Sequence, residues 1–150
     1  MSPPCLNYRK KAHIMTMSPQ ELIAAAKEAA HHAYAPYSNF EVGAAILTTD
    51  GTVFTGCNVE NASYGLTLCA ERNAATTMIA TTKPDSPRQI HSVAIVGLKA
   101  SPCWPCGSCR QVLREFGCQE VFVEGPTGEV HSLSFTELLP HSFGPEHLDT

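Results

Sequence analysis

Cys69-Ala70-Glu71 and Pro105-Cys106-Gly107-Ser108-Cys109 are the two stretches that decide how this chain is organised. Together they supply three thiols and one carboxyl group, at the starts of two expected helices. Three protein ligands on zinc leave one tetrahedral position open, which distinguishes a catalytic zinc site from a closed structural one. The spacing therefore predicts one zinc ion per subunit, bound by Cys69, Cys106 and Cys109. Glu71 lies beside the open position and is the expected catalytic residue, free to move protons.

Several stretches repeat, in order, the motifs of a known family. They are Tyr37-Ser38-Asn39-Phe40-Glu41-Val42-Gly43-Ala44-Ala45, Asn58-Val59-Glu60-Asn61, Cys69-Ala70-Glu71-Arg72 and Cys106-Gly107-Ser108-Cys109-Arg110-Gln111. On these motifs the chain resembles the homotetrameric, three-cysteine cytidine deaminases of the cytidine/deoxycytidylate deaminase superfamily. The stretch Leu138-Leu139-Pro140-His141-Ser142-Phe143-Gly144-Pro145-Glu146 is similar to the carboxyl end of the animal-type members. The similarity covers roughly residues 18 to 148.

The resemblance implies a fold, an activity and an assembly. The fold is a three-layer α/β/α sandwich with a mixed central sheet of about five strands. The activity is zinc-dependent hydrolytic deamination of free cytidine and 2′-deoxycytidine to uridine and 2′-deoxyuridine, with release of ammonia, in pyrimidine salvage. The assembly is a homotetramer whose active sites are shared between subunits.

The resemblance also implies roles for individual side chains. Asn58 and Glu60 grip the 3′-hydroxyl of the sugar, and their i, i+2 spacing in an extended segment puts both side chains on one face. Arg72 hydrogen-bonds the ligand sulfurs and offsets the excess negative charge of three thiolates. Substrate contacts are expected at Phe40, Asn58, Glu60, Ala62, Tyr64, Ala70 and Phe143, with Tyr64 and Phe143 reaching into a neighbouring subunit's site.

The expected chemistry follows from the metal and the carboxylate. Zinc lowers the pKa of a bound water from 15.7 toward ~7, so a nucleophile is available at neutral pH. Glu71 would accept the proton of that water, pass it to N3 of the pyrimidine and later protonate the departing ammonia. Both cysteine stretches begin helices, where unpaired N–H groups and the helix dipole favour anions such as thiolates.

The remaining pattern alternates helices with strands, which is typical of a layered α/β sandwich. Ser18 and Glu21 form a capping box ahead of a helix over 22–33, and Ser134 and Glu137 form another ahead of a short helix. Further helices are expected over 69–80 and 108–116. Strands are expected over 42–49, 52–57, 90–98, 120–123 and 130–133.

Length, charge and cysteine content indicate a single-domain protein that acts on a small molecule. A chain of 150 residues is one domain, with residues 18–150 as the cytidine deaminase catalytic domain and residues 1–17 as a flexible N-terminal extension. Apolar runs are too short for a membrane helix, and the start lacks the apolar segment of a secretory signal. A net charge of −4 without a basic stripe favours a small nucleoside over a nucleic-acid partner. Seven cysteines, an odd number, indicate metal thiolates and free thiols in a cytoplasmic protein.

Three alternatives remain open from the residues alone. Cys103 forms an overlapping C-x-x-C unit with Cys106, so it could replace a ligand or pair in a disulfide, although Pro105 stiffens that unit and favours a bystander role. Cys103-Trp104 is also bulkier than is usual before this motif in the family. The substrate could be another nucleoside, such as an aminopyrimidine nucleoside antibiotic, or a base in a polynucleotide. The chain could instead be a zinc-binding module without turnover.

Overall fold

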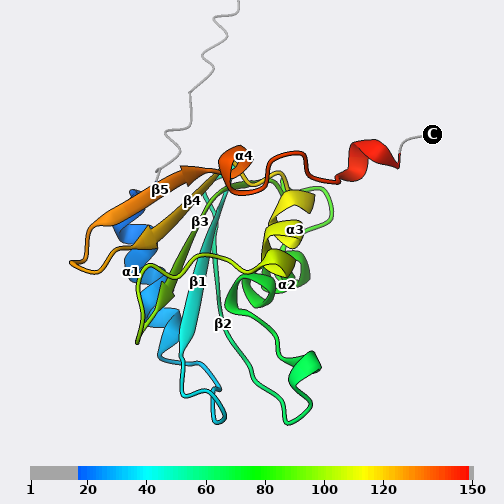
Figure 1. Ribbon diagram of the computed structural model, residues 1–150. Coiled ribbons are helices and arrows are strands. Elements are labelled where there is room, and N and C mark those ends of the chain that lie inside the picture. Colours follow the sequence, from blue (N-terminus) through cyan, green and yellow to red (C-terminus); the bar gives the residue numbers. More distant parts are fainter. Residues whose placement is uncertain (1–16, 149–150) are drawn as a thin grey trace, which may run out of the picture.

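One mixed sheet of five strands, in the order β2-β1-β3-β4-β5, is the scaffold of the computed structural model, which describes residues 17–148 (Figure 1). Antiparallel pairing joins β1 to β2, β1 to β3 and β4 to β5, and parallel pairing joins β3 to β4. The strands are β1 (Val42–Thr48), β2 (Val53–Cys57), β3 (Ile90–Gly97), β4 (Glu120–Glu124) and β5 (Val130–Ser134).

Helices cover both faces of this sheet, so the predicted three-layer α/β/α sandwich is confirmed (Figure 1). One face carries α1 (Pro19–Ala30), which packs on β1 and β3. The other carries α2 (Ala70–Thr81) and α3 (Gly107–Glu115), which lie side by side. The short elements are η1 (Tyr64–Leu66), α4 (Phe135–Leu138) and η2 (Pro145–His147). Among residues 17–148, no helix is both long and apolar enough to cross a membrane.

Local sequence signals account for most element starts. Both predicted capping boxes are present: Ser18 and Glu21 at the start of α1, and Ser134 and Glu137 at the start of α4. The first helix ends at Ala30, earlier than the predicted Ala33. Beyond it, Tyr34 exchanges backbone hydrogen bonds with the segment after β2, donating to Asn58 O and accepting from Glu60 N, so the chain leaves the helix to pair with an extended segment.

The core lies in two clusters, one on each face of the sheet. Alternation along β1 divides its buried residues: Ala44 and Ile46 join the cluster under α2 and α3, whereas Ala45 and Leu47 join the cluster under α1. A strand buried on both faces reads as a continuous apolar run, as predicted for β1. The predicted N-terminal extension lies, for residues 1–16, outside the described part of the chain, and the division at residue 18 stays a prediction.

The contact of α2 with β2 brings the start of α2 to the sheet. A Cβ atom added at Gly56 would lie 2.4 Å from Ala74 N and 2.7 Å from Ala70 O, so backbone meets backbone here. Asn73 Nδ2 donates to Cys57 O at 3.0 Å and ties the same helix to the end of β2. The absence of a side chain at Gly56 therefore sets where α2 begins, and with it the position of Glu71.

Gly56→Ala should destabilise the protein, because the new methyl group can be accommodated only if α2 moves away from the sheet. The expected loss in free energy of unfolding is about 1–3 kcal/mol, as for other overpacked sites. Gly65→Ala is the matched control, since a Cβ there meets nothing within 4 Å, and it should stay within about 0.5 kcal/mol of the wild type. Urea unfolding followed by circular dichroism measures both; equal midpoints for the two variants would contradict this packing argument.

Candidate active site

Three cysteine sulfurs converge where α2 and α3 begin. Cys69 is the N-cap residue of α2, Cys106 is the N-cap residue of α3, and Cys109 lies in the first turn of α3. All three Sγ atoms lie within 4.8 Å of one another, and Cys69 Sγ is 3.9 Å from Cys106 Sγ. A tetrahedral zinc ion with Zn–S bonds near 2.3 Å separates its sulfurs by about 3.8 Å. The spacing of these sulfurs therefore fits one zinc ion without rearrangement of the backbone.

Cys103 lies outside this cluster. The metal-competent group in residues 17–148 consists of Cys69, Cys106 and Cys109, and the cysteines in this range are all free thiols. Burial raises the pKa of Cys103 to about 11, so it stays a thiol at neutral pH. The geometry favours the second C-x-x-C unit as the metal loop, as predicted. Residues 17–148 supply three ligands to this group and leave a fourth tetrahedral position open.

The surroundings favour a thiolate at Cys69, whereas the hydrogen bond that Cys109 donates to Cys69 raises the pKa of Cys109. The pKa of Cys69 falls to about 5, chiefly through hydrogen bonding from Cys109, with a further contribution from Arg72. Arg72 Nη2 lies 3.9 Å from Cys69 Sγ and donates to Thr67 O at 2.7 Å. The N-termini of two helices add partial positive charge at the same place. These charges oppose the excess negative charge that three thiolates leave on a divalent ion.

Glu71 is buried beside the sulfurs. It is the second residue of α2, and only 4% of its surface is exposed. Burial raises its pKa above the usual value for a glutamate, and the nearby Cys69 sulfur acts in the same direction. A raised pKa makes this carboxylate a stronger base than an exposed glutamate, which suits it to general acid–base catalysis.

A cavity of about 250 Å³ opens in front of this group. Its lining includes Glu71, the two N-cap cysteines and several aromatic and aliphatic side chains. The lining residues are Ser38, Phe40, Val42, Asn58, Glu60, Thr67, Cys69, Ala70, Glu71, Cys103, Trp104 and Cys106. The structure thus brings the predicted substrate contacts Phe40, Asn58, Glu60 and Ala70 to the same cavity as the predicted metal site.

Asn58 and Glu60 do share this cavity, and both also hold the backbone around it. Asn58 is 8% exposed; its Oδ1 accepts from Val42 N at 2.8 Å and its Nδ2 donates to Phe40 O at 2.9 Å. Asn58 Oδ1 can still accept one further hydrogen bond, and its Nδ2 can still donate one. Glu60 Oε2 accepts from the backbone N–H groups of Tyr37 at 2.8 Å and Ser38 at 3.2 Å. Hydrogen bonding, chiefly from Ser38, keeps the pKa of Glu60 below its usual value, so it is an anion at neutral pH.

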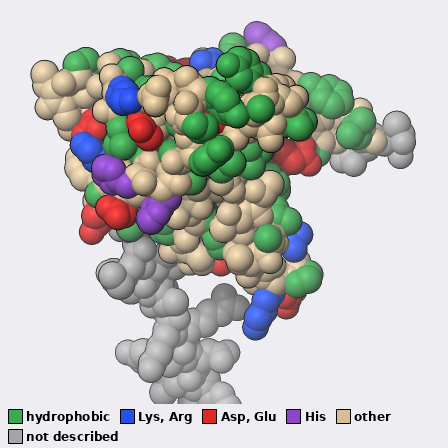
Figure 2. All heavy atoms as spheres, turned by 90° about the horizontal axis from the view of Figure 1, so that it is seen from below, with side chains coloured by type: hydrophobic (Ala, Val, Ile, Leu, Met, Phe, Trp, Pro, Cys, Tyr) green, Lys and Arg blue, Asp and Glu red, His purple; other side chains and the backbone are tan. Residues whose placement is uncertain are grey.

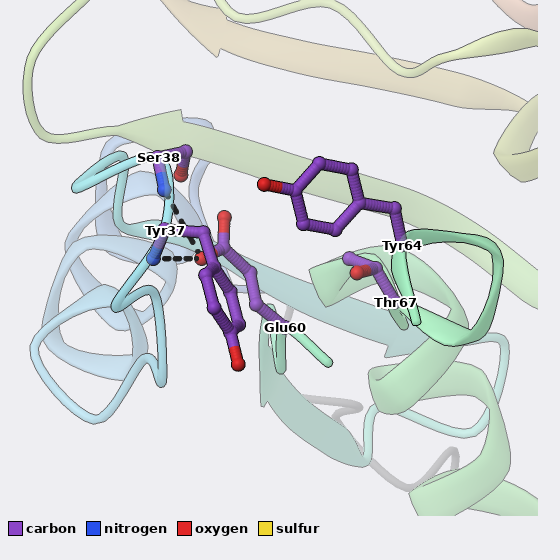
Figure 3. Close-up of a pocket in the computed structure, with 5 residues that line it drawn as sticks. All are labelled: Tyr37, Ser38, Glu60, Tyr64 and Thr67. Carbon is purple, nitrogen blue, oxygen red and sulfur yellow. Dashed lines mark hydrogen bonds between the residues drawn. The ribbon is translucent and has the colours of Figure 1, made fainter. Parts of the chain in front are cut away.

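An outer chamber of about 300 Å³ adjoins the cavity and shares Glu60 as a wall (Figure 3). Tyr37, Ser38, Tyr64 and Thr67 complete its lining. The Tyr37 and Tyr64 rings flank the entrance, with centroids 5.7 Å apart and planes tilted by 58°. Tyr64 is 73% exposed, so most of its ring remains available to another partner.

Two predicted substrate contacts lie away from the cavity of their own chain. Ala62 is exposed in the loop before η1 and lines neither the cavity nor the outer chamber. Phe143 is 56% exposed in the segment that runs past α3, where its ring stacks on His147 at 5.2 Å (Figure 1). Their predicted roles stay predictions, and a role for Phe143 in a neighbour's site requires a second subunit.

Comparison with known proteins identifies the family. Residues 16–124 match the model of the cytidine and deoxycytidylate deaminase zinc-binding region. The chain belongs to the cytidine and deoxycytidylate deaminase family. A cytidine deaminase of Sporosarcina psychrophila is 41% identical over 134 residues, covering 88% of this chain and 96% of the relative. A cytidine deaminase of Mycobacterium tuberculosis is 46% identical over 123 residues, covering 82% of this chain and 87% of the relative.

A solved structure agrees with this membership. The crystal structure of cytidine deaminase from Burkholderia pseudomallei superposes with a TM-score of 0.76 at 50% identity, covering 85% of this chain and all of that one. The chain is therefore an enzyme of a zinc-binding deaminase family, with a cysteine cluster able to hold the ion.

Five lining residues were not among the predicted site residues: Ser38, Val42, Thr67, Cys103 and Trp104. Ser38 and Val42 fall inside the family motif at 37–45, so their motif was a usable signal. Trp104 carried a signal of another kind, because it departs from the family pattern next to a metal ligand. Thr67 offered none, since its place in the site depends on how the loop before α2 folds back.

Replacing any one of Cys69, Cys106 and Cys109 with serine should remove the bound zinc, because a hydroxyl is a far poorer ligand than a thiolate. Cys103→Ser is the matched control and should keep one zinc per subunit, since its thiol lies outside the cluster. Atomic emission measurement of zinc per protein decides the matter. A Cys103 variant that lost the metal would show that the wrong C-x-x-C unit has been assigned.

Proposed function

We propose that this enzyme deaminates free cytidine and 2′-deoxycytidine by hydrolysis, giving uridine or 2′-deoxyuridine and ammonia. The observation that carries the proposal is the cluster of three sulfurs beside a buried carboxyl group, which lines a cavity together with Cys69 and Cys106. The relatives that align over most of the chain are named cytidine deaminases, which supports the choice of substrate.

Cys69, Cys106 and Cys109 would hold the zinc ion, which when bound supplies the Lewis acidity that makes water nucleophilic at neutral pH. Glu71 takes up the proton released from the attacking water, which its raised pKa permits. It delivers that proton to N3 of the pyrimidine as C4 becomes tetrahedral. It then takes the proton of the new C4 hydroxyl and passes it to the amine, so that the C4–N bond breaks, ammonia leaves and the C4 carbonyl forms. Glu71 therefore acts first as a base and then as an acid, and it finishes ready for another turnover.

The cavity walls orient the substrate for this transfer. With C4 at the metal end, the apolar side chains of Phe40, Val42 and Trp104 are available to pack on the pyrimidine ring. The sugar then points toward Glu60, whose carboxylate accepts a hydrogen bond from a ribose hydroxyl. Within the described residues, neither the cavity nor the outer chamber is lined by lysine or arginine. An anionic wall without a cation favours a nucleoside over a nucleotide.

A zinc module without turnover fits the site less well. A structural zinc site has four protein ligands, whereas the group found in residues 17–148 has three and faces a cavity. The buried, raised-pKa Glu71 would also serve no purpose in such a module, because burying a carboxyl group costs free energy.

Glu71→Gln should bind a full complement of zinc and turn over at least about 10²–10⁴-fold more slowly, because the amide cannot carry the proton. Zinc content and the loss of cytidine absorbance are measured on the same preparation. Near-normal turnover, or loss of the metal, would show that Glu71 is not the proton carrier.

Glu60→Ala should lower kcat/KM for cytidine by roughly ten- to a hundredfold, because a sugar hydroxyl loses its charged acceptor. Disturbance of the loop at Tyr37 and Ser38 would affect every substrate equally, so 3′-deoxycytidine is the control substrate. The wild type should prefer cytidine to 3′-deoxycytidine by a similar factor, and the variant should lose that preference. A preference that survives the substitution places the sugar contact elsewhere.

We propose further that the enzyme is a cytoplasmic homotetramer with shared active sites. Large apolar side chains are exposed, including Tyr64, Leu66, Phe143 and Leu148, and apolar side chains group on one face of the molecule (Figure 2). Exposed apolar surface of this kind is typical of interfaces. The cysteines of residues 17–148 are free thiols, which suits a reducing compartment.

Light scattering should give a mass of about 65 kDa, four times the 16.2 kDa chain. Truncation before Ser142 should lower kcat/KM and leave the zinc content unchanged, since every metal ligand lies upstream. A fully active monomer at assay concentration would be incompatible with shared sites.

A further inference from the structure

The two helices that carry the metal ligands each have an arginine in or next to their first turn. Arg72 follows Cys69 in α2 and donates to Thr67 O at 2.7 Å, ahead of the N-cap cysteine. Arg110 follows Cys109 in α3, and its Nε donates to Pro105 O at 2.9 Å, again ahead of the N-cap cysteine Cys106. In both helices the arginine side chain therefore extends past the N-terminus of the helix. Its guanidinium donates to a backbone carbonyl in the segment that precedes the N-cap cysteine.

The contacts of Arg110 join two distant parts of the chain. Besides Pro105 O, its Nη1 donates to Leu138 O at 2.8 Å, the carbonyl at the end of α4. Carbonyl groups at a helix end lack partners within the helix, and Pro105 is fully buried. One guanidinium thus satisfies two carbonyls that would otherwise cost free energy, and it anchors the metal loop to the end of α4.

The ligand that depends on this anchor is Cys106. Cys109 is buried and is held by packing, and Cys69 is half-buried, whereas the Cys106 side chain is exposed. An exposed side chain has few neighbours to fix its position, so the position of its Sγ follows from the backbone at Pro105 and Cys106. Outer-shell hydrogen bonds that orient metal ligands are worth 10–100-fold in metal affinity or activity.

From these contacts we infer that Arg110 is a positioning residue for the zinc site, which holds Cys106 in place through the Pro105 carbonyl. The role is distinct from that of Arg72, which contacts a ligand sulfur directly. Arg110 acts through the backbone and touches neither substrate nor metal.

The chain offers a matched control on the same helix. Arg114 lies one turn beyond Arg110; its Nε donates to Ser142 Oγ at 2.8 Å and its Nη2 pairs with Glu146. Both partners of Arg114 belong to the C-terminal segment, so Arg114 carries the same charge and a similar half-buried position without a contact to the metal loop. Comparing substitutions at Arg110 and Arg114 therefore distinguishes the loss of the contact with the metal loop from the loss of the contact with the C-terminal segment.

The test measures zinc release from the intact enzyme into an excess of chelator that changes colour on binding zinc, in the absence of substrate. Arg110→Ala should release zinc about 10–100-fold faster than the wild type, and Arg114→Ala should stay within about twofold. In the zinc-depleted Arg110 variant, kcat should fall with metal occupancy while KM for cytidine is unchanged, because the cavity walls remain in place. Arg110→Lys keeps the positive charge but replaces the planar guanidinium with a single ammonium group. Its zinc release rate should lie between those of Arg110→Ala and the wild type.

A folded Arg110→Ala protein that releases zinc at the wild-type rate overturns the inference, and so does an Arg114 variant that releases it equally fast. Where Arg110→Ala does not accumulate as folded protein, Arg110→Lys decides alone, and a wild-type release rate again overturns the inference. The inference rests on the zinc site of the proposed function. Because zinc release needs no turnover, an enzyme that binds zinc but fails to deaminate cytidine would refute the proposed function and leave the role of Arg110 measurable.

Discussion

The meeting of two helix starts is the constraint on which the rest of this structure depends. Three sulfurs can lie within bonding distance of one small ion only if the N-termini of α2 and α3 lie side by side on one face of the sheet. The close approach of α2 to β2 at Gly56 and the crossover through β3 to α3 set that geometry. The metal site is therefore a consequence of layer packing, and a shift of either helix would separate the ligands.

The same arrangement of helix starts places positive charge beside the anionic metal ligands. Three thiolates and a buried carboxyl group are brought into one corner of the protein, which is costly without compensation. Two helix dipoles and Arg72 supply positive charge at this corner. Arg110 adds hydrogen bonds to backbone carbonyls and leaves the cluster itself untouched. Glu71 is buried beside this cluster, and burial raises its pKa, which suits it to exchange protons.

The lining of the site combines several kinds of chemical group. The cavity is lined by Cys69 and Cys106, the buried Glu71 and apolar side chains, and it shares the anionic Glu60 with the outer chamber, which two tyrosines also line (Figure 3). A pyrimidine nucleoside carries matching groups: a reactive amine-bearing carbon, a flat ring and a sugar rich in hydroxyls. The lining therefore supports a nucleoside substrate.

Two metal ligands were predictable from local sequence, because Cys106 and Cys109 are spaced within one helix turn. Cys69 lies far from them in the sequence, and its assignment rested on residue type and on the family motif. Local sequence also predicted the element starts, since the capping boxes at Ser18 and Ser134 involve residues three apart. The layered fold followed from the alternation of strands and helices. The capping boxes require no knowledge of distant parts of the chain.

Tertiary structure alone decided the features that depend on distant segments. It ended α1 at Ala30 because Tyr34 pairs with the segment after β2. It gave Asn58 two backbone partners at the start of β1 and added Thr67 to the cavity wall. It left Ala62 and Phe143 outside the cavity of their own chain. The chemical capability of a side chain depends on its residue type, so the sequence by itself determined it. The neighbours of a side chain depend on packing between distant segments, so only the tertiary structure decided them.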